Sequence, residues 1–105
     1  MNKLKIMVLD DETIVCKRLK PSLEKLGHDV DIFTESAAAL ERINDFEYDI
    51  IITDLKMKGA DGMQLLTEAK KRSDRTEVIV ITGFATMETA KESFHKGVFD
   101  FIAKP

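Results

Sequence analysis

The chain has 105 residues, enough for one compact domain and too few for a second folded unit. Hydrophobic residues make up 44% and charged residues 33%, an ordinary globular composition that excludes a disordered tail. Sixteen basic and nineteen acidic residues give a net charge of −3, so no electrostatic footprint for nucleic acid is visible. The apolar run at residues 6–9 is too short for a signal peptide or a membrane span. We therefore expect a soluble, cytoplasmic domain without membrane contact.

Strands and helices alternate along the whole chain, as judged from runs of apolar residues and from helical spacing. In chain order the pattern predicts a strand at 4–9, a helix at 14–26, a strand at 30–33, a helix at 36–46, a strand at 49–53, a loop at 56–61, a helix to about 72, a strand at 78–81, a helix at 86–96 and a strand at 98–103. The strands read as continuous apolar runs, which is typical of a parallel sheet covered on both faces. The fold class is therefore α/β, a doubly wound five-stranded parallel sheet with four helices.

Some single residues refine these elements. Gly27 and Gly97 are predicted helix stops, and Asp61 is a plausible N-cap for the third helix. Pro21 lies inside the first helix and predicts a kink or a shortened helix, because it removes a backbone donor. The single cysteine, Cys16, cannot form an internal disulfide and is interpreted as a small buried hydrophobe.

Polar residues follow the strands at their carboxyl ends. They are Asp10, Asp11 and Glu12 after the first strand, Asp54 after the third, Thr82 at the end of the fourth and Lys104 after the fifth. Ligands of such sheets bind outside the carboxyl ends of the strands. Carboxylates packed together repel one another, and a hard divalent cation relieves that repulsion. One or two carboxylates with waters suit Mg²⁺, and the lysine and threonine could hold the oxygens of a phosphoryl group.

Four motifs carry a resemblance to a known family. They are Val8-Leu9-Asp10-Asp11, residues 49–54 (DIIITD), Val80-Ile81-Thr82-Gly83 and residues 101–105 (FIAKP). In this order, over the whole chain, they resemble the response-regulator receiver domain of two-component signalling. The resemblance implies a flavodoxin-like strand order 2-1-3-4-5. It also implies that residues 1–105 form one receiver domain that stops after the fifth strand, where intact relatives have a fifth helix.

The resemblance assigns roles to the strand-end residues. Asp54 would be the phosphoacceptor, attacking a phosphohistidine to form an acyl phosphate. Asp11 and Asp54 would bind Mg²⁺ directly together with the backbone carbonyl of Lys56, and Asp10 would bind it mainly through water.

Three further residues complete the implied site. Lys104 would pair with a phosphoryl oxygen, and Thr82 would turn inward to hydrogen-bond another. Phe101 would be the rotamer switch that moves with Thr82, and many relatives carry tyrosine there. The bond between Lys104 and Pro105 is expected to be cis, as is usual in the family.

The function that follows is a phosphorylation-controlled switch, a signalling domain that assists its own phosphorylation and dephosphorylation and is not an enzyme in the usual sense. A sensor histidine kinase or a phosphotransfer protein would donate the phosphoryl group. An output domain or downstream protein, typical of transcriptional regulation, would respond to it. Two alternatives stay open: an interaction module of the same fold that signals without phosphate, and a flavin carrier. The flavin carrier is disfavoured because no phosphate-cradling loop follows the first strand.

The lack of a fifth helix in this sequence has a physical consequence. Such a helix would cover part of one sheet face, so apolar sheet surface should be exposed or buried against a partner. We expect lowered stability, self-association through this surface, or exchange of an element with a second chain.

Overall fold

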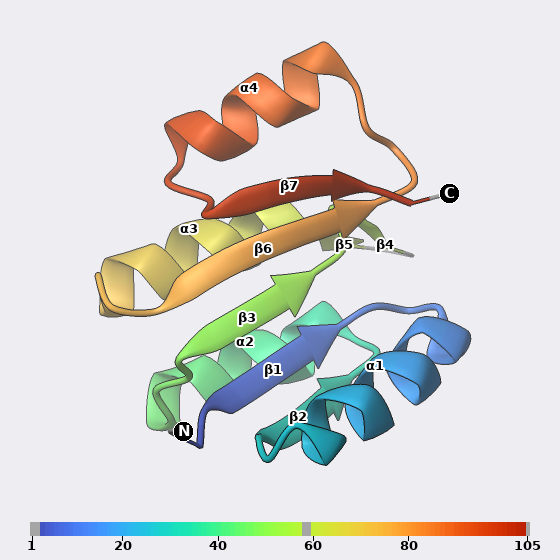
Figure 1. Ribbon diagram of the computed structural model, residues 1–105. Coiled ribbons are helices and arrows are strands. Elements are labelled where there is room, and N and C mark those ends of the chain that lie inside the picture. The colour runs from blue at the N-terminus through green and yellow to red at the C-terminus, as the bar shows by residue number, and fades with distance from the viewer. Residues whose placement is uncertain (1–2, 58–59, 105) are drawn as a thin grey trace.

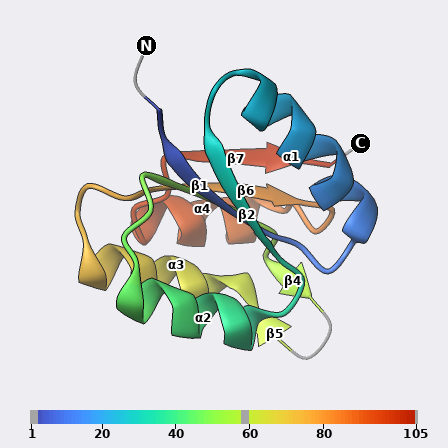
Figure 2. The ribbon, with the colours of Figure 1, turned by 90° about the horizontal axis from the view of Figure 1, so that it is seen from below.

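The fold is a central parallel sheet with helices on both faces (Figures 1 and 2). The computed structural model describes residues 3–57 and 60–104, with only the course of the backbone at 56–57 and 60–61. The strands of the central sheet are β1 (Lys5–Leu9), β2 (Asp29–Phe33), β3 (Ile50–Thr53), β6 (Glu77–Thr82) and β7 (Asp100–Ala103). The helices are α1 (Thr13–Lys25), α2 (Ser36–Asp45), α3 (Gly62–Arg72) and α4 (Met87–His95). None of these helices is long and apolar enough to cross a membrane.

The order of strands in the sheet is β2-β1-β3-β6-β7, and every neighbouring pair is parallel. This is the expected order 2-1-3-4-5, with β6 and β7 as the fourth and fifth strands. The order reverses beside β1, because the chain first moves from β1 outward to β2 and then continues from β3 on the other side. At such a switch point the loops that follow the two strands diverge and leave room for a site.

Two hydrophobic cores hold the layers together. The larger core joins the sheet to α2 and α3, and its members include Met7, Leu9, Ile51, Leu65 and Leu66, all essentially without exposed surface. The smaller core lies under α1 and contains Ile6, Val8, Cys16 and Val30. Successive residues of β1 therefore serve opposite faces, which explains why this strand is apolar throughout.

Most of the expected boundaries hold to within one or two residues, and the helix ends follow their expected chemistry. Gly27 and Gly97 end α1 and α4 with φ of 98° and 95°, a left-handed conformation that favours glycine. The hydroxyl of Thr86 accepts from the backbone N–H of Thr89 and caps α4. The helix α1 continues through Pro21 to Lys25, so it is not shortened, and the alternative expectation of a kink stays a prediction. The peptide bond to Pro105 lies outside the described residues.

One correction concerns the segment before α3. The loop predicted at 56–61 contains two short strands, β4 (Lys56–Met57) and β5 (Ala60–Asp61), which pair in antiparallel fashion. The helix α3 begins directly after it, at Gly62. Capping by the Asp61 side chain lies outside what the structure describes.

Part of the sheet face on the side of α1 carries apolar side chains at the surface. Across the strands from β3 to β7, one row of paired residues consists of Ile52, Ile79 and Asp100. Two residues further along β6 and β7, Ile81 pairs with Ile102. Ile102 exposes 43% of its surface, and Ile79 and Ile81 are half-buried. Among the described helices only α1 lies on this face, over β1 and β2 (Figures 1 and 2). Exposed apolar sheet surface is therefore present, as expected.

Gly62 lies against the backbone of the β3–β4 connection and yields a prediction. A Cβ at this position would overlap the carbonyl oxygen of Asp54, far inside contact distance. We expect Gly62→Ala to lower the free energy of unfolding by ~1–3 kcal/mol, because the backbone next to Asp54 must shift. Gly83→Ala is the matched control, since nothing lies within 4 Å of its added Cβ. Urea denaturation of both variants checks this, and equal stabilities would contradict it.

Candidate functional site

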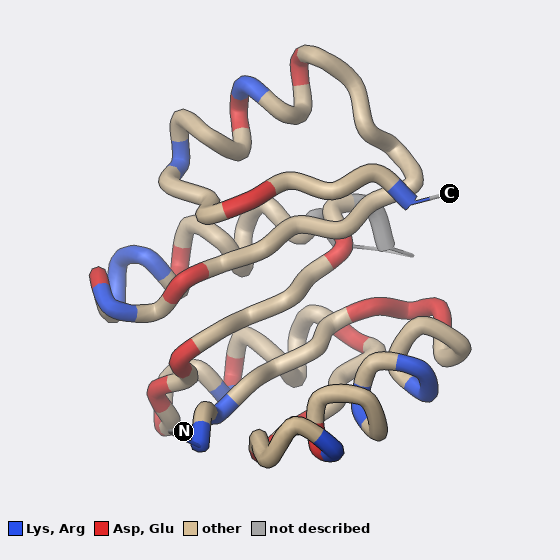
Figure 3. The backbone as a smooth tube through the Cα atoms, in the orientation of Figure 1, with Lys and Arg blue, Asp and Glu red and all other residues tan. Residues whose placement is uncertain are grey.

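The site is built where the strands end, and the sheet ladder itself sets its backbone. The N–H of Asp54 donates to the carbonyl of Leu9 at 3.0 Å, and the N–H of Lys104 donates to that of Thr82 at 2.8 Å. Each residue therefore continues the ladder one step beyond its strand. Acidic residues follow β1 and β3 and a basic residue follows β7 at one edge of the sheet (Figure 3).

Lys104 is the centre of this arrangement. Its Nζ lies 3.0 Å from Asp54 Oδ2, 2.9 Å from Asp10 Oδ2 and 2.6 Å from Glu12 Oε1. Only 13% of the lysine side chain is exposed. The expected meeting of Asp10, Asp54 and Lys104 is therefore present in the structure, with Glu12 as an additional partner.

Two of the three carboxylates are buried. Asp10 exposes 2% of its surface and Asp54 exposes 4%. Both oxygens of Asp10 are in use, since Oδ1 accepts the N–H of Glu12 at 2.9 Å and Oδ2 faces Lys104. Burial raises the pKa of Asp10 above the ordinary carboxyl value, and the hydrogen bonds from Glu12 and Lys104 oppose this rise only in part.

The same contacts keep Lys104 charged. Burial acts to lower the pKa of its ammonium, but the hydrogen bonds to Glu12, Asp10 and Asp54 outweigh burial and raise the pKa well above the ordinary lysine value. A permanent positive charge is therefore held at the edge of the sheet beside Asp54.

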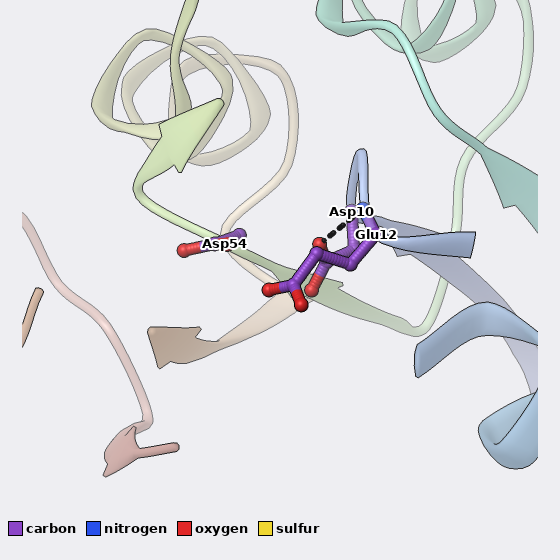
Figure 4. Close-up of side chains that lie close together, drawn as sticks. All are labelled: Asp10, Glu12 and Asp54. Atoms are coloured by element: carbon purple, nitrogen blue, oxygen red, sulfur yellow. Dashed lines mark hydrogen bonds between the residues drawn. The ribbon is translucent and has the colours of Figure 1, made fainter. Parts of the chain in front are cut away.

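A group of acidic residues that could hold a metal ion consists of Asp10, Glu12 and Asp54, with one oxygen of each within 4.8 Å of the others (Figure 4). The donors are carboxylate oxygens, and the net charge of three carboxylates and one ammonium is negative. This donor set suits a hard cation such as Mg²⁺ or Ca²⁺. Asp11 is exposed in the β1–α1 loop and Lys56 lies in β4, and the metal-binding roles expected for them stay predictions.

Glu12 is the site residue that sequence reasoning missed. It is one of the three acids after the first strand, and neither the sequence pattern nor the resemblance implies a role for it. Its contact with Lys104 joins residues 92 positions apart, so no local pattern could reveal it. The one available signal was its place directly after two site acids on a strand end.

Thr82 and Phe101 lie in neighbouring strands behind the acids. Thr82 has no exposed surface, and its Oγ1 accepts the N–H of Phe84 at 3.1 Å. Phe101 pairs with Val80 in the ladder between β6 and β7 and is half-buried against the larger core. Thr82 is thus the last residue of β6, and Phe101 lies three residues before Lys104 in β7.

Known proteins match both the sequence and the fold. The family model for the response regulator receiver domain matches residues 6–105. The transcriptional regulatory protein QseB of Escherichia coli O157:H7 is 29% identical over 102 residues, which cover 97% of this chain and 47% of QseB. The regulatory protein AtoC of Escherichia coli K12 is 32% identical over 101 residues, which cover 96% of this chain and 22% of AtoC. The chain therefore spans half or less of the length of these regulators.

Solved structures agree. A CheY-like response regulator receiver domain protein from Methanospirillum hungatei JF-1 is 28% identical, with a TM-score of 0.93, over 99% of this chain and 83% of that one. A response regulator from Burkholderia pseudomallei is 25% identical, with a TM-score of 0.91, over 99% of this chain and 61% of that one. That structure is described as holding a phosphorylated aspartic acid, a calcium ion and citrate.

The fold and the strand-end acids define a doubly wound α/β signalling domain with an acidic site at the switch point of its sheet. The chain belongs to the response regulator receiver domain family. The relatives that it resembles include a transcriptional regulatory protein, QseB, and a regulatory protein, AtoC.

The buried ion pairs of Lys104 yield a stability prediction. Lys104→Met leaves Asp10 and Asp54 buried without their cation, so we expect a loss of about 3 kcal/mol in the free energy of unfolding near pH 7. The loss should shrink as the pH falls toward the ordinary carboxyl range. Lys104 opposes the rise in the Asp10 pKa that burial causes, so without Lys104 the folded protein takes up a compensating proton on Asp10 at a higher pH.

Lys3→Met is the matched control, since Lys3 pairs with Asp29 at 3.3 Å with both side chains more than half exposed. The Lys3→Met variant should lose less than ~1 kcal/mol in the free energy of unfolding. Urea titrations at neutral and mildly acidic pH measure both. A loss of stability in Lys104→Met no larger than that in Lys3→Met, or one that grows as the pH falls, would contradict this prediction.

Proposed function

We propose that this receiver domain accepts a phosphoryl group on Asp54 in a Mg²⁺-dependent reaction and changes conformation in response. The contact between the buried Asp54 carboxylate and the Lys104 ammonium carries this proposal. The Asp54 carboxylate is a nucleophile. The fixed positive charge of Lys104 beside it can balance the negative charge of an incoming phosphoryl group, and the two neighbouring acids can hold a metal ion that does the same. The phosphorylated aspartic acid of the Burkholderia pseudomallei regulator supports the same chemistry.

In the proposed reaction an Asp54 carboxylate oxygen attacks the phosphorus of a phosphohistidine on a sensor kinase or phosphotransfer protein. An O–P bond forms, the P–N bond to the donor breaks, and the imidazole leaves and takes up a proton. Lys104 then donates a charge-assisted hydrogen bond to one oxygen of the phosphoryl group on Asp54. Hydrolysis by water later restores the Asp54 carboxylate and releases inorganic phosphate.

The residues proposed to hold Mg²⁺ are Asp11 and Asp54 directly, the backbone carbonyl of Lys56, and Asp10 mainly through water. When bound, the ion offsets the negative charge that builds up on the transferring phosphoryl oxygens. Asp10 is suited to a water-mediated role, because it is buried and its Oδ1 is already used by the N–H of Glu12.

The response is proposed to pass through Thr82 and Phe101. To reach a phosphoryl oxygen on Asp54, the Thr82 hydroxyl must give up the hydrogen bond that it now accepts from the N–H of Phe84. That change loosens the start of the β6–α4 connection and leaves room for the half-buried Phe101 ring to move inward. The surface formed by α4, β6 and β7 would then differ between the two states.

Membership of the family supports a proposal about partners and location. We propose a sensor histidine kinase or phosphotransfer protein as donor and an output domain or downstream protein as recipient, in the cytoplasm. Residues 1–105 are proposed to act as one receiver domain that assists its own phosphorylation and dephosphorylation. Self-association through the exposed apolar sheet face with Ile102 is part of the same proposal.

Intact mass spectrometry tests the reaction. The protein is incubated with Mg²⁺ and acetyl phosphate, and we expect a gain of one phosphoryl group that disappears in Asp54→Asn and in the presence of a chelator. Asp100→Asn is the matched control, because Asp100 is an exposed carboxylate at the opposite end of β7. It should be phosphorylated like the unmodified chain.

Two results would contradict the proposal. A phosphoryl gain that persists in Asp54→Asn would assign the chemistry to another residue. No gain in the folded, unmodified chain would leave an interaction module of the same fold that signals without phosphate.

A further inference from the structure

We propose that Glu12 is a positioning residue that holds the Lys104 ammonium at the site when a divalent cation is held beside Asp10 and Asp54. This inference rests on the proposed metal-dependent function and concerns the regulation of the same site. It gives a role to the one member of the acidic group that the receiver chemistry described above does not use.

The contacts of Lys104 are unequal in length and in setting. The shortest, 2.6 Å, is to Glu12, whereas those to Asp10 and Asp54 are 2.9 and 3.0 Å. Glu12 is also the one exposed partner, with 57% of its side chain accessible, while Asp10 and Asp54 expose 3% and 4%. Its backbone N–H donates to Asp10 Oδ1, which fixes the start of the Glu12 side chain beside the site.

A cation at this site and the Lys104 ammonium compete for the negative charge of the same carboxylates. The ammonium uses Oδ2 of both Asp10 and Asp54, and these carboxylates belong to the group that could hold a metal ion. A divalent cation bound near these carboxylates repels the neighbouring ammonium and neutralises part of their negative charge. Of the three partners only Glu12 reaches outward from the two buried acids, so it can keep the ammonium while they turn to the cation.

This difference between the two states sets the sign of the effect. In the cation-free protein three carboxylates contact the Lys104 ammonium, so removing the Glu12 charge destabilises the protein only slightly. In the cation-bound protein Glu12 is the main partner of the ammonium, so the same change destabilises the cation-bound state more. Glu12→Gln should therefore weaken Mg²⁺ binding, and it should do so through Lys104. If Glu12 were itself a ligand, the loss would be as large or larger without Lys104.

A double-mutant cycle separates these two roles. Mg²⁺ affinity is measured for the unmodified chain, Glu12→Gln, Lys104→Met and the double variant, by NMR titration at constant ionic strength. We expect Glu12→Gln to weaken Mg²⁺ binding about threefold to tenfold in the unmodified background and less than twofold in the Lys104→Met background. In Mg²⁺-saturated protein, the ammonium resonance of Lys104 should persist in the unmodified chain and be lost in Glu12→Gln.

Two controls keep the result interpretable. Glu24→Gln removes another exposed carboxylate that pairs with a lysine, Lys20 at 3.4 Å, but at the far end of α1. It should leave Mg²⁺ affinity unchanged, which excludes a general effect of net charge. Lys104→Gln repeats the cycle with a polar replacement, and far-ultraviolet circular dichroism verifies that each variant is folded.

The outcomes distinguish this inference from the proposed function. Equal weakening by Glu12→Gln with and without Lys104 would overturn the positioning role and make Glu12 a metal ligand, while Mg²⁺-dependent phosphorylation of Asp54 would stand. No change on Glu12→Gln in the unmodified background would likewise overturn only the inference. A chain that binds no Mg²⁺ at all would overturn both.

Discussion

The ion pairs of Lys104 are the interaction on which the site depends. Asp10 and Asp54 are almost wholly buried, and two carboxylates at such a place are stable only with a counter-charge. Lys104 supplies it from the end of the last strand, 50 residues after Asp54. The site therefore forms only when the strands from β1 to β7 have paired, so the ion pairs of Lys104 depend on the whole sheet.

The sheet topology explains how one lysine can reach both acids. Asp10 and Asp54 follow the neighbouring strands β1 and β3, whereas Lys104 follows β7, with β6 between them. The lysine side chain must cross the end of β6, and the residue there is Thr82, whose short side chain is fully buried. Thr82 thus ends the strand that lies between those of Asp54 and Lys104.

Much of this could be predicted from the sequence, for identifiable reasons. Apolar runs that end in Asp10 and Asp54 mark buried strands and their carboxyl ends, and parallel pairing brings such ends to one edge. The order of strands came from the family resemblance, since periodicity does not encode which strands are neighbours. Two features do not follow from local patterns. They are the Glu12–Lys104 contact, which joins distant residues, and the pairing of β4 with β5.

The central claim is that Asp54, beside Lys104, is the residue that accepts the phosphoryl group. The most direct test is to phosphorylate the protein with acetyl phosphate and Mg²⁺, reduce it with borohydride and map its peptides by tandem mass spectrometry. An acyl phosphate is reduced to an alcohol, so a phosphorylated aspartate becomes homoserine. The account predicts homoserine at position 54 alone. Homoserine at position 10 or 11, or none in a protein that has gained a phosphoryl group, would contradict it.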